Sequence, residues 1–227
     1  MRNTRIIIFS FFIISALAGC KNDSVKHIDE GEIHYNLTYI GRVGTVSEAM
    51  LPNSMVVKFK NNKILMEIMT PIGNNGIFNI IDPEQEKVET FIRLLGMRFY
   101  YSGVYGEVPP GIDPMEDMVI VKTGKKKDVF GLECLNAVAT IPSTGYTYDL
   151  WYTDKISIDN PNQSTPYKDI EGVLVSFFYR MGDMIVEFDA DGLYKKTIPD
   201  KDFITDEKYR KINREDMDSI ISKMMNL

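Results

Sequence analysis

Cys20 is the residue whose chemistry can be read most directly, because of the residues that precede it. Arg2 and Arg5 give the chain a basic start, and the run from Ile6 to Ala16 (IIIFSFFIISA) is almost entirely apolar. This pattern is typical of a secretory signal, and the run is shorter than the roughly 20 apolar residues that a membrane-spanning helix needs. A cysteine thiol placed directly after such a segment is a nucleophile that can carry a lipid chain.

The end of this segment, Leu17-Ala18-Gly19-Cys20, resembles the lipobox of bacterial lipoproteins. The resemblance implies cleavage before Cys20, with acyl groups such as palmitate on its thiol and on the new amino terminus. Several acyl chains anchor a protein stably, whereas one holds it only marginally. We therefore predict a signal peptide over residues 1–19, a lipidated flexible tether over residues 20–30 and a single β domain over residues 31–227. Lys21 stands where an aspartate would resemble an inner-membrane retention signal.

The absence of an aspartate at position 21 favours the outer membrane of a Gram-negative cell, with the domain facing the periplasm or the cell surface.

The chain has 26 Lys and Arg against 32 Asp and Glu, and its net charge is −6. An acidic domain is a poor partner for nucleic acid or for anionic lipid, because both attract the opposite charge. Asp23-Ser24-Val25 also resembles the O-glycan sequon of certain such bacteria.

Other groups that could do chemistry are few and unfavourably spaced. His27 and His34, the two histidines, lack the spacing of metal ligands, and Asp189-Ala190-Asp191-Gly192 lacks the later ligands of a calcium loop. No nucleophile elbow or phosphate-binding glycine loop occurs. Cys134 alternates with apolar residues in LECLNAVAT and is expected in the core, because a nucleophilic thiol needs a nearby base. We therefore expect no enzyme, no metal and no cofactor.

The elements that would position any site are mostly strands. Period-2 alternation of apolar residues, separated by turn residues, predicts roughly ten to twelve strands and no strand–helix alternation. A mainly β fold with one strongly curved antiparallel sheet follows. We expect turns at Asn61-Asn62-Lys63, at residues 123–128 and at Asp189-Ala190-Asp191-Gly192, and a loop at residues 157–166. The predicted strands cover residues 31–40, 55–59, 64–69, 77–82, 87–95, 97–102, 117–122, 132–140, 146–153, 172–180, 183–190 and 193–199.

One amphipathic helix is predicted at the C-terminus. Asn213 is a suitable N-cap, and Glu215 and Asp216 lie in the first turn, where the helix dipole favours negative charge. Its apolar positions share one stripe: Met217, Ile220, Ile221, Met224 and Met225. The stripe either packs on the sheet as ordinary core or lines an apolar pocket, since methionine adapts to irregular shapes.

Strands 146–153 and 172–180 are apolar on both faces, so both faces must be covered. Two arrangements satisfy this requirement: a cover that leaves a pocket, and a two-layer core without a cavity. If a pocket exists, we predict that its wall comes from these strands and from the helix stripe, through Tyr146, Tyr148, Tyr152, Phe177, Tyr179, Met217, Ile221 and Met224.

Several short segments are similar to an uncharacterised family of secreted bacterial proteins with the fold of the lipoprotein carriers LolA and LolB. The segments are GEIHYNLTY, SMVVKFKNNKILME, KKDVFGLECLNAVAT, DLWYTDKI, YKDIEGVLVSF and PDKDFITDEKYRKI. Related proteins carry GLPGLI where this chain has residues 169–174, of which only the glycine and the hydrophobic character are kept. The resemblance implies a curved half-barrel with a C-terminal helix packed on its concave side, leaving an apolar cavity. It supplies no catalytic residues.

Two functional hypotheses remain. The first is a non-enzymatic, membrane-anchored lipoprotein that binds a lipid or acyl chain in the concavity of its sheet. The second is a protein-binding or glycan-binding module of an envelope complex that uses exposed aromatic side chains. The two differ in whether Tyr100, Tyr101, Tyr105 and Trp151 form an exposed patch.

Overall fold

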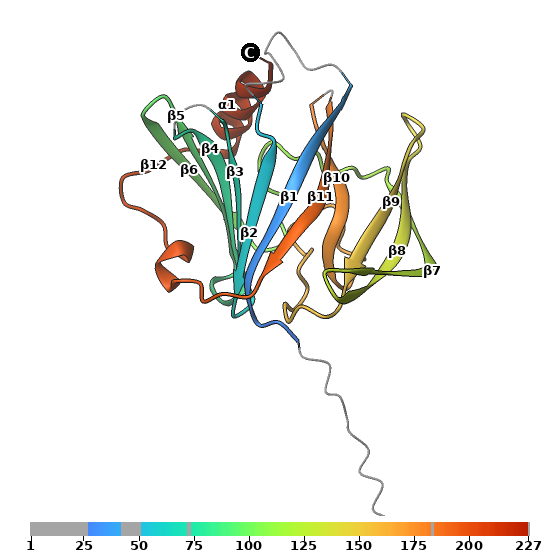
Figure 1. The fold of residues 1–227 in the computed structure, drawn as a ribbon. Helices are drawn as coiled ribbons and strands as arrows, with labels where there is room; N and C mark the ends of the chain where they lie inside the picture. Colours follow the sequence, from blue (N-terminus) through green and yellow to red (C-terminus); the bar gives the residue numbers. More distant parts are fainter. Residues whose placement is uncertain (1–26, 42–50, 72–73, 183, 227) are drawn as a thin grey trace, which may run out of the picture.

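A computed structural model describes residues 27–41, 51–71, 74–182 and 184–226 of this chain (Figure 1). The predicted signal peptide, Cys20 and most of the predicted tether lie outside these residues. In the described part, twelve strands form one sheet and one α-helix follows them. The elements are β1 (Glu30–Gly41), β2 (Ser54–Lys60), β3 (Lys63–Met69), β4 (Gly76–Asp82), β5 (Lys87–Leu94), β6 (Met97–Val104), β7 (Val119–Val129), β8 (Leu132–Ile141), β9 (Tyr146–Thr153), β10 (Val173–Met181), β11 (Met184–Tyr194), β12 (Arg210–Lys211) and α1 (Arg214–Asn226), with short 3-10 helices at Pro83–Gln85 and Asp200–Phe203.

The mainly β fold expected from the alternation is confirmed. The strand order is β12-β6-β5-β4-β3-β2-β1-β11-β10-β9-β8-β7, and every pair is antiparallel except β12 with β6. The predicted hairpin between β2 and β3 is also confirmed. Asn61 and Asn62 both have positive φ, at 49° and 61°, as a two-residue turn with the twist of the strands requires.

Two strands are longer than predicted, and three local predictions are therefore wrong. The expected turn at residues 123–128 lies inside β7, which continues past an irregularity between Lys122 and Lys126. The expected turn at residues 189–192 lies inside β11, because β1 supplies its ladder partners through Tyr194. Residues 195–199 form no strand, so the predicted strand over 193–199 is only the end of β11. Pairing with a neighbouring strand outweighs the weak strand propensity of Asp, Gly and Lys.

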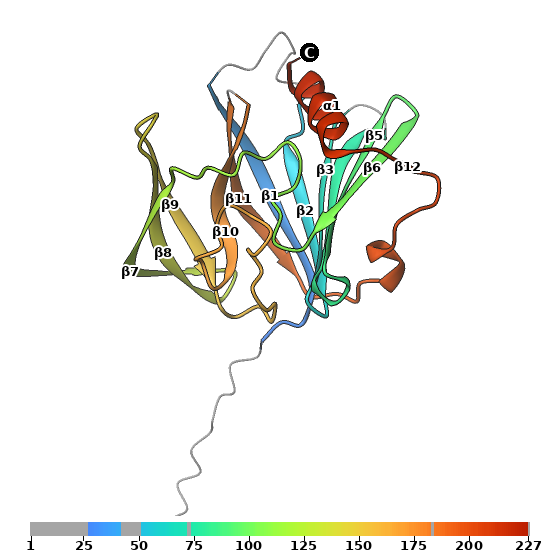
Figure 2. The ribbon, with the colours of Figure 1, turned by 180° about the vertical axis from the view of Figure 1, so that it is seen from behind.

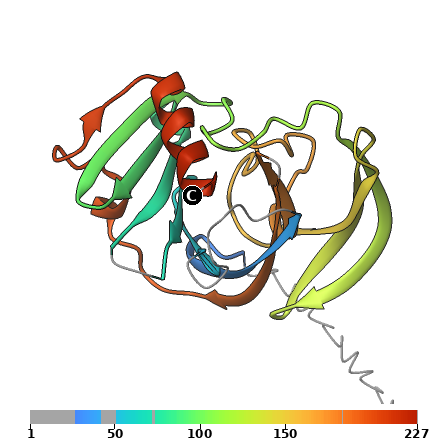
Figure 3. The same ribbon diagram turned by 90° about the horizontal axis from the view of Figure 1, so that it is seen from above.

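The sheet curves strongly, as Figure 3 shows from above. The joint between β9 and β10 is short: only Val173, Leu174 and Ser176 of β10 pair across it, with an irregularity between Leu174 and Ser176. Beyond this joint the strands separate, and Phe178 fills the gap against the edges of the rings of Tyr146 and Tyr148, at centroid distances of 5.0 and 5.7 Å. The β9-β8-β7 part can therefore turn away from the rest of the sheet.

Side chains pack on the inner face of the sheet and on part of its outer face. The inner face carries the main core, which includes Tyr35, Phe59, Ile81 and Phe177. Helix α1 covers the same face, because its Met217 packs in a cluster with Ile77, and Ile77 and Ile81 of β4 point to one side. Figures 2 and 3 show α1 inside the curve of the sheet. The outer face of β3, β4 and β5 is covered by the segment between β11 and β12, whose side chains Ile198, Phe203 and Tyr209 pack on Leu65, Ile80 and Phe91.

Helix α1 is attached to the loop between β6 and β7 by polar contacts. Asn213 caps the helix as predicted, accepting a hydrogen bond from the Asp216 backbone N–H at 2.8 Å. Arg214 bonds to the Glu107 carboxylate and to the Val108 carbonyl at 3.0 Å. Glu107 also accepts a hydrogen bond from the Tyr101 hydroxyl at 2.8 Å. The helix is thus held to the inner face by charge as well as by its apolar stripe.

These contacts predict a loss of stability in acid. Burial opposes ionisation of Glu107, but the hydrogen bonds from Tyr101 and Arg214 outweigh it and lower the pKa of this carboxyl from 4.5. A folded-state pKa below the unfolded value contributes stability that is present above about pH 4.5 and is lost as the pH falls through the lower, folded value. Glu107→Gln should cost about 1–2 kcal/mol at pH 7. Urea titrations between pH 7 and pH 3 should show a smaller loss in this variant than in the wild type, and equal losses would contradict the assignment.

Gly111 marks where the same loop touches α1. Its φ is +84°, its N–H donates to the Asp218 carboxylate at 2.9 Å, and a Cβ here would lie 2.6 Å from Ile221 Cγ2. Gly111→Ala should therefore lower the free energy of unfolding by about 2–4 kcal/mol, combining backbone strain with displacement of the helix. Gly145→Ala is the matched control, since φ is +71° there and nothing lies within 4 Å of the added Cβ. Thermal unfolding of the two variants would isolate the helix contact, and equal shifts would exclude it.

The start of the domain differs from the predicted boundary. Ile28 is only 4 % exposed and forms a parallel bridge with Ile156, and β1 begins at Glu30. The packed domain therefore begins before residue 31, and the predicted tether ends before residue 30. In the described part of the chain, no helix has the length and apolarity to cross a membrane.

Candidate functional site

Among the described residues, the inner face of the sheet carries a small apolar cavity with a volume of about 50 Å³. Strands β1 to β4 and β10 form its floor, through side chains such as Tyr35, Val57 and Phe177. Its other wall comes from the connection between β9 and β10, which includes Asn162 and Thr165. Apart from these two residues the lining is apolar except for tyrosine hydroxyls, so the cavity suits an apolar group.

Residues 154–172, between β9 and β10, are here called the covering segment. Its Tyr167 is fully buried, and the ring lies 6.2 Å from the ring of Phe177 and 6.1 Å from that of Tyr179. The Tyr167 hydroxyl donates to the carbonyl of Phe178. Burial raises the pKa of this hydroxyl well above its usual value of 10, so it remains a neutral donor at any physiological pH. Tyr167 thus attaches the covering segment to β10.

Asn162 holds the covering segment in its closed shape. It is 4 % exposed, and its Nδ2 donates to the carbonyls of Ile170 at 2.7 Å and Gly172 at 2.8 Å. The Asn162 carbonyl accepts from the Thr165 hydroxyl at 2.9 Å. These bonds provide partners for backbone groups that pack against the apolar core, where an unpaired carbonyl would be costly.

The structure brings only part of the predicted wall together. Phe177 and Tyr179 line the cavity. Tyr152 belongs to the same core cluster without lining the cavity. The helix residues Met217, Ile221 and Met224 lie in a separate cluster with Ile77 and Ile92, beneath α1. Among the described residues, the helix stripe and β10 therefore belong to different core clusters.

Tyr146 and Tyr148 belong to a polar network in the gap between β9 and β10. The Tyr146 hydroxyl donates to Glu187 at 2.5 Å, and the Tyr148 hydroxyl lies 2.9 Å from the Ser176 hydroxyl and donates to Asp189 at 3.2 Å. Burial, followed in the case of Tyr146 by the hydrogen bond to Glu187, raises the pKa of both tyrosines. Both hydroxyls therefore stay protonated and serve as donors to the carboxylates of β11.

The aromatic side chains of the second hypothesis do not form an exposed patch. Tyr100, Tyr101, Tyr105 and Trp151 are each half-buried. Tyr100 stacks on Phe91 of the outer face, whereas Tyr101 and Tyr105 pack against two different inner-face clusters. Trp151 lies under the Lys127 ammonium, 4.2 Å from the ring centroid. The property that would have favoured a protein- or glycan-binding surface is thus absent at these four residues.

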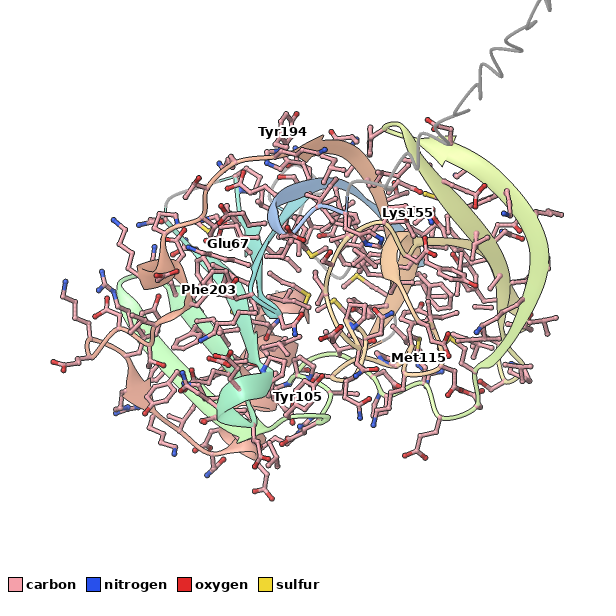
Figure 4. All side chains as sticks on the ribbon, turned by 90° about the horizontal axis from the view of Figure 1, so that it is seen from below. Glu67, Tyr105, Met115, Lys155, Tyr194 and Phe203 are labelled. Atoms are coloured by element: carbon pink, nitrogen blue, oxygen red, sulfur yellow. The ribbon has the colours of Figure 1, made fainter. Side chains whose placement is uncertain are left out.

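Two larger hollows lie at the end of the sheet where the described chain begins. One has a volume of about 490 Å³ and is lined by Ile28, Phe130, Gly131, Leu132, Glu133, Lys155, Leu193 and Lys195. We call it the basal groove. The second, of about 370 Å³, shares Ile28 and Lys195 with it and adds polar residues from the chain start and the β2–β3 turn. Figure 4 shows this end from below, with Lys155 labelled.

In the described ranges, no three His, Cys, Asp or Glu side chains lie close enough together to hold a metal ion. Cys134 is fully buried, as predicted, and burial raises the pKa of its thiol. A buried neutral thiol is a poor nucleophile.

The covering segment contains the residues that the sequence prediction missed. Residues 157–166 read as a polar loop, yet Ile158, Asn162 and Thr165 line the cavity, and Tyr167 and Ile170 follow within the core. The available signal was the placement of large apolar side chains between turn-forming residues, because a solvated loop has no need of them.

Comparison with known proteins supports the fold and gives no family membership. No family model matches the chain, and no curated protein sequence matches it significantly. Among solved structures, that of PNGF-II matches 86 % of this chain with 16 % identity and a TM-score of 0.55. The match covers 33 % of PNGF-II, so this chain spans about a third of that protein's length. At this identity the match shows a shared fold alone.

Two further structures match with lower TM-scores. The LolA superfamily protein NE2245 from Nitrosomonas europaea matches 78 % of this chain and 91 % of its own, with 10 % identity and a TM-score of 0.34. The Mycobacterium tuberculosis lipoprotein LppX matches 75 % of this chain and 90 % of its own, with 10 % identity and a TM-score of 0.33.

Proposed function

We propose that this protein is a non-enzymatic lipoprotein of the cell envelope, anchored through acylated Cys20, that binds an apolar ligand such as a lipid or acyl chain on the inner face of its sheet. The observation that carries the proposal is the cavity under the covering segment, which has an apolar floor and a cover formed by one connection between two strands. By the resemblance of its N-terminus, we place it at the outer membrane of a Gram-negative cell.

The cavity is smaller than the ligand that it is proposed to bind. Pockets for small ligands typically measure about 300–1,000 Å³, whereas this cavity measures about 50 Å³. An acyl chain therefore requires the covering segment to move away from the sheet.

The free energy needed to open the covering segment, compared with the free energy gained by burying a ligand, predicts the length of the alkyl chain. Opening would expose the side chains of Ile156, Tyr167 and Ile170, each worth about 1.5–3 kcal/mol when buried. Each methylene group of a ligand contributes about 0.8 kcal/mol when it is buried. Burial of roughly six to eleven methylene groups is therefore needed to offset the free energy of opening, before other binding costs. We therefore expect chains of about twelve carbons or more to bind, and chains of six to eight carbons to fail.

This expectation can be tested with a series of alkyl chains of one headgroup, from six to sixteen carbons, in competition with an environment-sensitive apolar dye. The full chain with Cys20→Ser, purified without acylation, would be used, and organic extracts of the same preparation would be examined for co-purified lipid. Affinity that rises steeply near twelve carbons supports the proposal. Failure of the dye and of every chain length to bind, with no lipid in the extract, would reject it.

A further inference from the structure

Two hairpin tips of this sheet have the same unusual composition. The β5–β6 turn consists of Leu95 and Gly96, and the β7–β8 turn of Phe130 and Gly131; φ is 49° and 84° in the first and 55° and 75° in the second. Asparagine or aspartate suits the first position of such a turn, whereas a bulky apolar residue is strained there. Leu95 is 80 % exposed and Phe130 is 45 % exposed. The turns match locally, so only their surroundings distinguish them.

The topology places these two tips at opposite ends of the sheet. β1 starts at the end where the described chain begins, and successive antiparallel pairs make β5 run away from that end and β7 run towards it. Phe130 therefore lies beside Ile28 in the basal groove, whereas the β5–β6 turn lies at the far end, as in Figure 1.

The basal groove combines apolar and basic side chains. Phe130 and Leu193 contribute apolar surface, and Lys155 and Lys195 contribute positive charge. Lys155 pairs with Asp154 at 2.8 Å, and Glu133, the one acidic residue in the lining, pairs with Lys126 at 2.8 Å. Among the described residues, Lys195 forms no ion pair. An exposed aromatic ring beside lysines is the composition of a surface that contacts lipid headgroups, where rings lie at the interface and ammonium groups meet phosphates.

The position of the anchor brings this groove towards a bilayer. Six residues separate Cys20 from His27, the first described residue, so the span between them is at most about 25 Å at 3.6 Å per residue. The step rests on the proposed acylation of Cys20. Given that acylation, the end of the sheet with the basal groove must stay near the membrane.

We propose that the basal groove docks on the membrane surface, with Phe130 at the level of the headgroups and Lys155 and Lys195 against the phosphates of anionic phospholipids. The net charge of −6, which becomes −8 when Arg2 and Arg5 are removed with the signal peptide, argues against an anionic surface at long range. Screening limits that repulsion, since charges further than about 8 Å from the surface contribute little at physiological salt. The contact is therefore decided by the residues of the groove, and it leaves the helix end of the domain facing away from the bilayer.

The matched tips allow a direct test with the acylated chain, which begins at Cys20, in vesicles. Phe130→Cys or Leu95→Cys is labelled with a nitrobenzoxadiazole dye; Cys134 is fully buried and the Cys20 thiol is acylated, so the introduced thiol is the one that reacts. Vesicles contain phosphatidylglycerol with brominated acyl chains, which quench dyes at the membrane. We expect at least fivefold stronger quenching at position 130 than at position 95. Lys155→Gln and Lys195→Gln should each weaken docking roughly fivefold. Replacing phosphatidylglycerol with neutral phosphatidylcholine should weaken docking as much as both substitutions together.

The outcomes separate this inference from the proposed function. Protein that does not stay on the vesicles would refute the anchoring, and the docking with it. Anchored protein with equal quenching at the two tips, or stronger quenching at position 95, would refute the docking alone. Quenching at position 130 could also stay the same after both lysine substitutions and after the change of lipid charge. That result would refute the role of the lipid phosphates and overturn the proposal as stated.

Discussion

Replacing Tyr167 with alanine is expected to lower the free energy of unfolding by about 3–5 kcal/mol, the largest effect that a single side chain of the covering segment should have. The ring is fully buried among Phe177, Phe178 and Tyr179, so its removal leaves a cavity next to the one already present. Loss of the hydroxyl also removes a donor from the Phe178 carbonyl. Tyr167→Phe, which keeps the ring, should cost only about 1–2 kcal/mol.

Urea unfolding of both variants would measure these differences, with Tyr194→Ala as the control, because Tyr194 is 50 % exposed and the same truncation there should cost about 1 kcal/mol or less. The new cavity should also accept a small apolar molecule, as engineered apolar cavities do. p-Cresol, which has the shape of the missing side chain, is expected to raise the melting temperature of Tyr167→Ala and leave the wild type unchanged. Equal destabilisation by Tyr167→Ala and Tyr194→Ala would show that the ring does not hold the covering segment.

Replacing Asn162 with leucine is expected to lower the free energy of unfolding by about 2–5 kcal/mol and to increase binding of apolar dyes. Leucine has a similar size, but it leaves the carbonyls of Ile170 and Gly172 without the donor that they have in the closed state. Each unpaired buried carbonyl costs about 1–3 kcal/mol. Opening the covering segment lets water reach both carbonyls, so the substitution shifts the population towards the open form that the proposed function requires.

Asn136→Leu is the matched control for this prediction. Asn136 is 1 % exposed, and its Nδ2 donates to the Leu150 carbonyl at 3.0 Å and to Asp149 at 3.1 Å, within β8 and β9 and away from the covering segment. It should destabilise the domain without increasing dye binding at temperatures well below unfolding. Measurements of dye affinity for the two variants at equal folded fraction show whether the covering segment controls access to the cavity. If Asn136→Leu increases binding as much as Asn162→Leu, then general loosening, and not the covering segment, controls access.

Local chemistry was sufficient to predict most elements of the fold. The turn at Asn61 and Asn62 follows from the tolerance of asparagine for positive φ, and the start of α1 follows from the capping side chain of Asn213. The alternation in β8 placed Cys134 in the core. Each of these features depends on residues within a few positions of one another, so the sequence contains the whole cause.

The residues of the predicted cavity wall that line one cavity are two positions of one strand. Phe177 and Tyr179 point to the same side of β10 and line the cavity together. Tyr146 and Tyr148 do not join them, because β9 and β10 separate beyond the irregularity near Ser176. The helix stripe was predicted as an apolar face, but its partner surface, Ile77 and Ile92, follows from strand order. Strand order and irregular pairing depend on distant segments, which periodicity does not report.

The sequence by itself determined the resemblance of its N-terminus to a lipoprotein signal, the mainly β character of the domain and the amphipathic stripe of its one described helix. Only the tertiary structure decided that residues from the segment 154–172 pack over the inner face and line its cavity, and that Phe130 and Lys155 line one groove at the end where the described chain begins. The physical reason is that alternation states which side chains must be buried, whereas the curvature of the assembled sheet decides what buries them. In this protein a connection with the composition of a loop takes that position, and the binding proposed here depends on its movement.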